Sequence, residues 1–129
     1  MEKLIGIVVF GELCQERICW EELQEKLRIQ VILAPSLEEF REITNLREVE
    51  GLLVEMPHAR LIKKLLGNAK MIVCHPMSEP PEPEQLEAIG AFHAVPLPLK
   101  FDEVLHSFGF VCQALSNPKA VKVIAIDAA

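Results

Sequence analysis

Residues 4–10 read LIGIVVF, an unbroken apolar run that Gly11 and Glu12 close. A run of this length, without polar alternation, is typical of a strand in a parallel sheet whose two faces are both covered by helices. The next segment, residues 16–28, places apolar side chains at helical spacing among charged ones. The start of the chain therefore predicts a buried strand followed by an amphipathic helix.

The same alternation continues along the chain. Further strands are predicted at residues 29–34, 49–55, 70–74 and 94–97, and further helices at 36–44, 59–66, 84–91 and 101–115. Ser36 stands three residues before Glu39, which is the spacing of a capping box at a helix start. Five strand–helix alternations predict an α/β fold, a doubly wound five-stranded parallel sheet with helices on both faces. In such a sheet the functional site lies at the carboxyl ends of the strands.

Composition limits the classes of function. The 129 residues are 50% hydrophobic, which fits one domain with ample apolar surface to bury. A net charge of −6 argues against non-specific binding to nucleic acid or to anionic membranes, because both need a basic surface. The four cysteines are too sparse for a disulfide scaffold, and no apolar stretch approaches the ~18 residues that span a bilayer. We expect a cytoplasmic domain with no membrane partner and no direct nucleic-acid binding.

One stretch is more specific than the rest. Residues 90–105 read GAFHAVPLPLKFDEVL, with a Gly-Ala pair, a short strand, Pro98 and an acidic helix start. Together with the strand EGLLVE at residues 50–55, this stretch resembles the receiver domain of bacterial two-component response regulators. The resemblance implies a flavodoxin-like sheet in the order 2-1-3-4-5.

The resemblance covers roughly residues 3–116, and we expect residues 1–116 to form the receiver-like domain. Residues 117–129 are then a linker or an extra strand. Within them, residues 120–126 read AVKVIAI, the pattern of a strand. It fits an added edge strand, a strand swapped onto a neighbour, or the start of a following domain.

The resemblance also implies a phosphoryl site, and this chain departs from it. Receivers accept a phosphoryl group on an aspartate that ends the third strand, and hold Mg²⁺ with an acidic pair after the first strand. Here Glu55 stands at the acceptor position, and the acidic pair reads Gly11-Glu12, so one carboxylate is missing. The lysine that neighbours the phosphoryl group in receivers falls on Leu97, just before Pro98.

Two further positions of the implied site also differ. The hydroxyl residue after the fourth strand falls on Cys74, and the small residue that follows it falls on His75, which we expect to crowd the phosphoryl position. Because phosphoryl transfer depends on positioning and on cations that neutralise charge, these losses predict a degenerate pseudo-receiver. It would be no enzyme, would need no cofactor and would act by binding a protein partner or a second copy of itself. The alternative is an atypical phosphorylatable receiver in which Glu12 and Glu55, weak metal candidates, bind Mg²⁺.

The last predicted helix supplies candidate interface residues. A stripe at helical spacing is expected to face the sheet: Phe101, Leu105, Phe108, Cys112 and Leu115. Val104, Phe110 and Val111 are left outside that stripe, and the last-helix face is a partner surface in receivers. We therefore expect these three residues and His106 in or beside a homodimer or partner interface. The alternative is a wider core stripe that buries them within one chain.

The cysteines suggest two other chemistries. Cys14 follows the first strand, as the nucleophile of thiol-phosphate enzymes does, so a small cysteine phosphocarrier or enzyme is a third hypothesis. Arg17 is only three residues further on, closer than the arginine that activates such a thiol. Cys74, His75 and His93 lack the paired ligand spacing of zinc sites. We therefore expect the thiols to be buried and inert.

Overall fold

Five parallel strands form one sheet in the order β2-β1-β3-β4-β5 in the computed structural model, which describes residues 4–116. The strands are β1 (Ile5–Phe10), β2 (Ile29–Ala34), β3 (Gly51–Glu55), β4 (Lys70–Pro76) and β5 (Ala91–Leu97). This confirms the predicted doubly wound parallel sheet and its strand order. The predicted strand at residues 120–126 and the predicted boundary at 117 lie outside the described residues.

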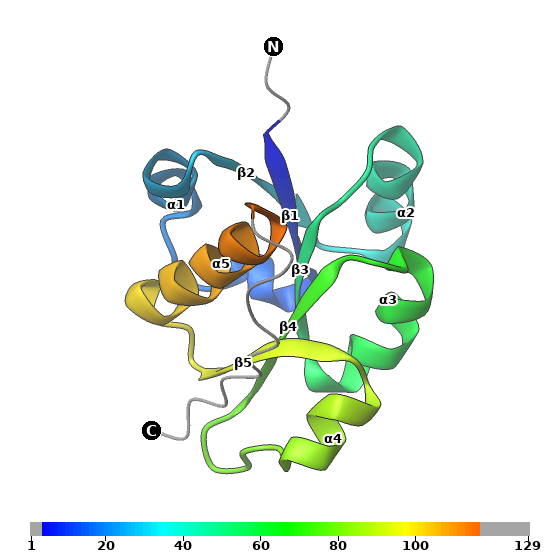
Figure 1. Ribbon diagram of the computed structural model, residues 1–129, viewed down its shortest axis with the longest axis vertical. Coiled ribbons are helices and arrows are strands. Elements are labelled where there is room, and N and C mark those ends of the chain that lie inside the picture. The colour runs from blue at the N-terminus through cyan, green and yellow to red at the C-terminus, as the bar shows by residue number, and fades with distance from the viewer. Residues whose placement is uncertain (1–3, 117–129) are drawn as a thin grey trace.

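Helices cover both faces of the sheet (Figure 1). One face carries α1 (Trp20–Leu27) and α5 (Phe101–Ser116), and the other carries α2 (Leu37–Leu46), α3 (Ala59–Leu66) and α4 (Pro83–Ala88). Two short 3-10 turns, η1 (Gly11–Gln15) and η2 (Met56–His58), follow β1 and β3. Among residues 4–116, no helix combines the length and apolar character needed to cross a membrane.

Local signals account for most of the element boundaries. The Ser36 hydroxyl accepts a hydrogen bond from the Glu39 N–H at 3.2 Å, as the capping spacing predicted. The first helix begins at Trp20, later than predicted, because the chain first makes the η1 turn. β5 begins at Ala91, three residues earlier than predicted, and its pairing with β4 has a register shift between Met71 and Ile72.

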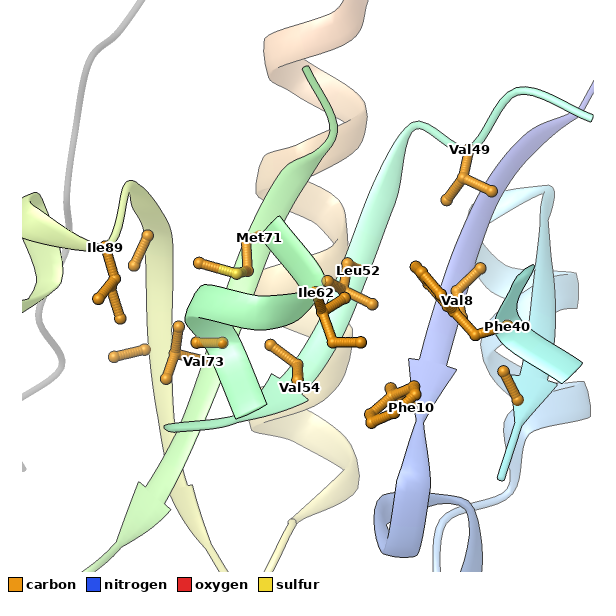
Figure 2. Close-up of a cluster of buried hydrophobic side chains, with 14 of the residues drawn as sticks. Val8, Phe10, Phe40, Val49, Leu52, Val54, Ile62, Met71, Val73 and Ile89 are labelled. Atoms are coloured by element: carbon orange, nitrogen blue, oxygen red, sulfur yellow. The ribbon is translucent and has the colours of Figure 1, made fainter. Parts of the chain in front are cut away.

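Each face of the sheet has its own apolar cluster. On the face of α2, α3 and α4, strand residues such as Val8 and Leu52 pack against Phe40 and Ile62, all fully buried (Figure 2). Neighbouring strand residues point to the opposite face and form a second cluster with α1 and α5. Because strand side chains alternate, one run of apolar residues supplies both clusters. Each fully buried side chain contributes about 1.5–3 kcal/mol.

The buried stripe of α5 differs from the predicted one. Val104, Phe108 and Val111 are fully buried and pack in the cluster of α1 and α5. The expectation that Val104 and Val111 lie at a protein interface is therefore corrected, because neither reaches the surface. Their i, i+4, i+7 spacing makes them the centre of a wider core stripe.

The other two candidate interface residues remain accessible. His106 is exposed and Phe110 is half-buried. The Phe110 ring lies between two histidine rings, with centroids 4.5 Å from that of His106 and 5.4 Å from that of His93. His93 is buried, and its Nδ1 lies 2.6 Å from the Ser107 hydroxyl. This contact between His93 and Ser107 joins β5 to α5 beneath His106 and Phe110.

Candidate functional site

A cleft of about 750 Å³ opens at the carboxyl ends of the strands. It is lined by Glu12, Leu13, Gln15, Glu16, Glu55, Pro76, Met77, Ser78, Leu97 and Pro98. The lining comes from η1 and the residue after it, the end of β3, the end of β4 with the loop that follows, and the end of β5. The predicted positions Glu12, Glu55, Leu97 and Pro98 therefore meet at one site, as parallel strand ends should.

The backbone explains how the two predicted carboxylates reach this cleft. Gly11 has φ of +72°, a left-handed conformation that glycine adopts without strain, and it turns the chain out of β1 into η1. That turn carries Glu12, whose side chain is exposed. Glu55 is the last residue of β3 and is half-buried. The cleft therefore has one carboxylate at its open side and one at the end of the sheet.

A third carboxylate, which the sequence reasoning did not select, closes one side of the cleft. Glu16 Oε1 accepts a hydrogen bond from the Leu99 N–H at 3.0 Å. Leu99 is buried, so its N–H needs such a partner. The bond joins the segment after η1 to the loop between β5 and α5, 83 positions apart. No local pattern signals a contact over that separation.

The electrostatic character of the cleft is negative. Glu12, Glu16 and Glu55 line it, and none of its described lining residues is Lys, Arg or His. Below it, burial raises the pKa of the Cys74 thiol well above its usual range, and the charges of Glu55 and Glu16 raise this pKa further. Cys74 is therefore a neutral thiol at neutral pH. An incoming dianionic phosphoryl group would meet like charge and, among the described residues that line the cleft, no compensating side-chain cation.

Cys74 and His75 do not line the cleft. Cys74 is buried in the apolar cluster of α1 and α5. Because side chains alternate along β4, the next residue points to the other face. His75 is buried there, and its Nδ1 lies 2.9 Å from the Pro76 carbonyl oxygen. The expectation that His75 crowds the phosphoryl position is therefore wrong.

Magnesium, which this fold implies, does not fit the residues present. One member of the implied acidic pair is Gly11, which has no carboxylate. Within residues 4–116, no three His, Cys, Asp or Glu side chains converge closely enough to hold a metal ion. Mg²⁺ needs near-octahedral oxygen coordination, in which one or two precisely placed carboxylates are completed by retained waters. No chemical step through a metal follows from this arrangement.

Cys14 is not arranged as a nucleophile. Its Sγ lies 3.2 Å from the Val9 carbonyl oxygen and donates its proton there. Burial is the main cause that raises the pKa of the Cys14 thiol, and the charge of Glu39 adds to it. A raised pKa keeps the thiol protonated at neutral pH, whereas a nucleophilic cysteine needs a lowered one.

Comparisons with known proteins identify the fold. No protein-family model matches the sequence, and no curated protein matches it. Among solved structures, a response regulator receiver domain protein from Clostridium thermocellum is similar with a TM-score of 0.65 and 18% identity. The similarity covers 88% of this chain and 98% of that one.

Two other similar structures are response regulators whose descriptions mention phosphorylation. One, with a TM-score of 0.61 and 14% identity over 84% of this chain and 96% of that one, is an atypical orphan response regulator described as having a phosphorylation-independent regulatory mechanism. The other, from Burkholderia pseudomallei, contains a phosphorylated aspartic acid and a calcium ion. It has a TM-score of 0.54 and 15% identity over 91% of this chain and 77% of that one. At these identities the likeness is one of fold, and it confirms the receiver fold that the sequence predicted.

Proposed function

We propose that this chain, which has the fold of response-regulator receiver domains, is a signalling module that works without a phosphoryl group. In this proposal it acts through contact with a protein partner or a second copy, and it catalyses no reaction. The observation that carries the proposal is the charge of the cleft at the strand ends. Glu12, Glu16 and Glu55 line that cleft, and Leu97 stands where the resemblance implies a lysine.

The physical argument concerns charge compensation. A phosphoryl group in transfer spreads negative charge over its oxygens, and catalysis consists mainly of positioning them and neutralising that charge. The resemblance implies a magnesium ion and a lysine for this purpose. This chain has a glycine at one metal-ligand position and a leucine at the lysine position. Each loss removes compensation for the negative charge of the phosphoryl group, so their effects on that charge compensation add.

The precedent for such a module is the similar atypical response regulator, whose described regulation is independent of phosphorylation. The alternative, an atypical phosphorylatable receiver that uses Glu12 and Glu55 with Mg²⁺, lacks a converging set of metal ligands among the described residues. The cysteine enzyme alternative is disfavoured because the pKa of the Cys14 thiol is raised. The proposed location is the cytoplasm.

Phosphodonor labelling tests the proposal. The full chain is incubated with acetyl phosphate and Mg²⁺, and its intact mass is measured over time. We expect no phosphoryl adduct. An adduct that maps to Glu55 or to any residue of the cleft would overturn the proposal.

A reconstructed variant provides the positive control. The triple substitution Gly11→Asp, Glu55→Asp and Leu97→Lys restores the acidic pair, the acceptor and the cation that the resemblance implies. A Cβ added at Gly11 meets nothing within 4 Å, and aspartate tolerates the left-handed conformation better than most residues. We expect this variant to be labelled. If it stays unlabelled, the missing groups are not the reason why the chain is inert, and the physical argument is wrong.

A further inference from the structure

Two neighbouring helices on one face of the sheet have opposite charge. α3 reads ARLIKKLL and carries Arg60, Lys63 and Lys64 with no acidic residue. α4 reads PEQLEA and carries Glu84 and Glu87 with no basic residue. The two helices lie next to each other in the same layer (Figure 1). This surface is therefore a basic strip beside an acidic strip, on a chain whose net charge is −6.

A groove of about 340 Å³ lies between the two strips. Arg60 lines one side of it and Glu84 lines the other, and Met56 and Ile89 contribute apolar surface between them. The two charged side chains do not pair across the groove. Within the described part of the chain, the ion pair that forms is Arg47 with Glu50, at the opposite end of the sheet. Lys63 Nζ donates to the Ala69 carbonyl oxygen at 3.2 Å, so the charges that remain for another molecule are those of the exposed Arg60 and Lys64 on α3 and of Glu84 and Glu87 on α4.

The basic strip also presents apolar surface. Leu61 and Leu65 lie one turn apart on α3, with 53% and 41% of their surface exposed. Burying such apolar area contributes favourable free energy to association, which exposed ion pairs alone provide only weakly.

We propose that this α3–α4 surface binds a second copy of the chain. A two-fold axis along the groove places α3 of each protomer over α4 of the other. A two-fold interface uses the same patch on both subunits, so the patch must complement itself. A basic strip and an acidic strip on either side of one groove meet that requirement, since each strip then faces the strip of opposite charge on the other protomer.

Other occupants fit less well. An anionic membrane would attract the basic strip but repel the acidic strip and the remaining negative charge. A small basic or acidic protein segment would satisfy one strip and leave the other facing like charge. The second copy is a partner for the module proposed above, but the inference does not depend on the chemistry of the cleft, and phosphodonor labelling has no bearing on it.

Sedimentation velocity on the full chain, over a range of concentrations, tests the proposal. We expect the unaltered chain to dimerise with rising concentration. The double substitution Arg60→Glu and Lys64→Glu makes both strips acidic, and Glu84→Lys with Glu87→Lys makes both basic. We expect each of these variants to remain monomeric, with at least a tenfold weaker association.

The decisive sample is the equimolar mixture of the two variants. In a mixed dimer the acidic α3 of one variant faces the basic α4 of the other, and the second pair of strips is also opposite in charge. The mixture should therefore regain the dimer that neither variant forms alone. These residues are exposed, so their substitution leaves the core intact. Lys26→Glu on α1, on the opposite face of the sheet, is the matched control and should leave association unchanged.

Three results would overturn the inference. The first is an unaltered chain that stays monomeric at all concentrations. The second is a dimer that both charge-reversed variants retain. The third is a dimer that Phe110→Glu on α5 abolishes while the α3 and α4 variants keep it, which would place the interface on the α5 surface instead.

Discussion

Replacing Gly6 with alanine should destabilise the protein through one distant side chain, that of Arg47. A Cβ at position 6 would lie 2.5 Å from Arg47 Nη2 and 2.7 Å from its Cζ, so the guanidinium must move. Where it stands, Nε donates to the Glu48 carbonyl oxygen at 3.1 Å and Nη2 to the Leu4 carbonyl oxygen at 3.2 Å. The guanidinium also binds the Gln30 side chain and pairs with Glu50 at 3.6 Å.

The magnitude follows from these contacts. Each hydrogen bond contributes about 0.5–1.5 kcal/mol, and the lower end applies because the group is partly exposed. Displacing the guanidinium should therefore cost about 1.5–3 kcal/mol. A Gly-to-Ala change also restricts the unfolded chain, which offsets about 0.4–1 kcal/mol. Subtracting the offset from the cost, we expect Gly6→Ala to lower the free energy of unfolding by about 0.5–2.6 kcal/mol.

A double-mutant cycle isolates the cause. In an Arg47→Ala background the clash is absent, so Gly6→Ala should be neutral or should stabilise by up to about 1 kcal/mol. Urea unfolding of the four proteins, followed by circular dichroism, gives the coupling energy. A Gly6→Ala change that costs the same in both backgrounds would refute this reasoning.

Three further predictions concern the site and the core. Glu16→Ala leaves the buried Leu99 N–H without its partner and should lower the free energy of unfolding, measured by urea unfolding, by about 1–2 kcal/mol, whereas Glu12→Ala should leave this free energy unchanged. Val111→Ala should cost about 1.5–3 kcal/mol because it opens a cavity, and His106→Ala less than about 0.5; equal effects would contradict the observed phase of α5. Burial raises the pKa of Cys74 in the folded state, so its contribution to stability is complete below the ordinary thiol pKa and is lost as pH rises through the raised folded pKa. The free energy of unfolding should accordingly fall at alkaline pH. In Cys74→Ala, urea unfolding measured across the same pH range should show a smaller fall. If the free energy of unfolding falls equally steeply with pH in this variant, the prediction is wrong.

The sheet was predictable because its strands carry strong local signals. A continuous apolar run such as residues 4–10 fits a strand buried on both faces, and the Ser36 cap marks a helix start directly. The η1 turn was missed because residues 11–15 carry no turn signal apart from Gly11. The early start of β5 and the register shift near it depend on pairing with β4, so they leave no trace in the sequence of β5 alone.

The phase of α5 shows a limit of helical periodicity. The predicted stripe and the observed stripe both have apolar residues at i, i+4 and i+7, because the helix is apolar over most of its circumference. Only the packing against the sheet selects Val104 and Val111 for the core. The same distinction applies to the site. Its strand-end residues were predictable from topology, whereas the bond from Glu16 to Leu99 exists only in the folded chain.

The most direct test of the central claim is a calorimetric titration of Mg²⁺ into the full chain. The claim is that the cleft at the strand ends lacks the groups needed to hold a metal ion and to compensate a phosphoryl charge. We predict no saturable heat of binding for the unaltered chain, and saturable binding once Gly11→Asp and Glu55→Asp are introduced together. Saturable Mg²⁺ binding by the unaltered chain that Glu55→Ala removes would contradict the claim.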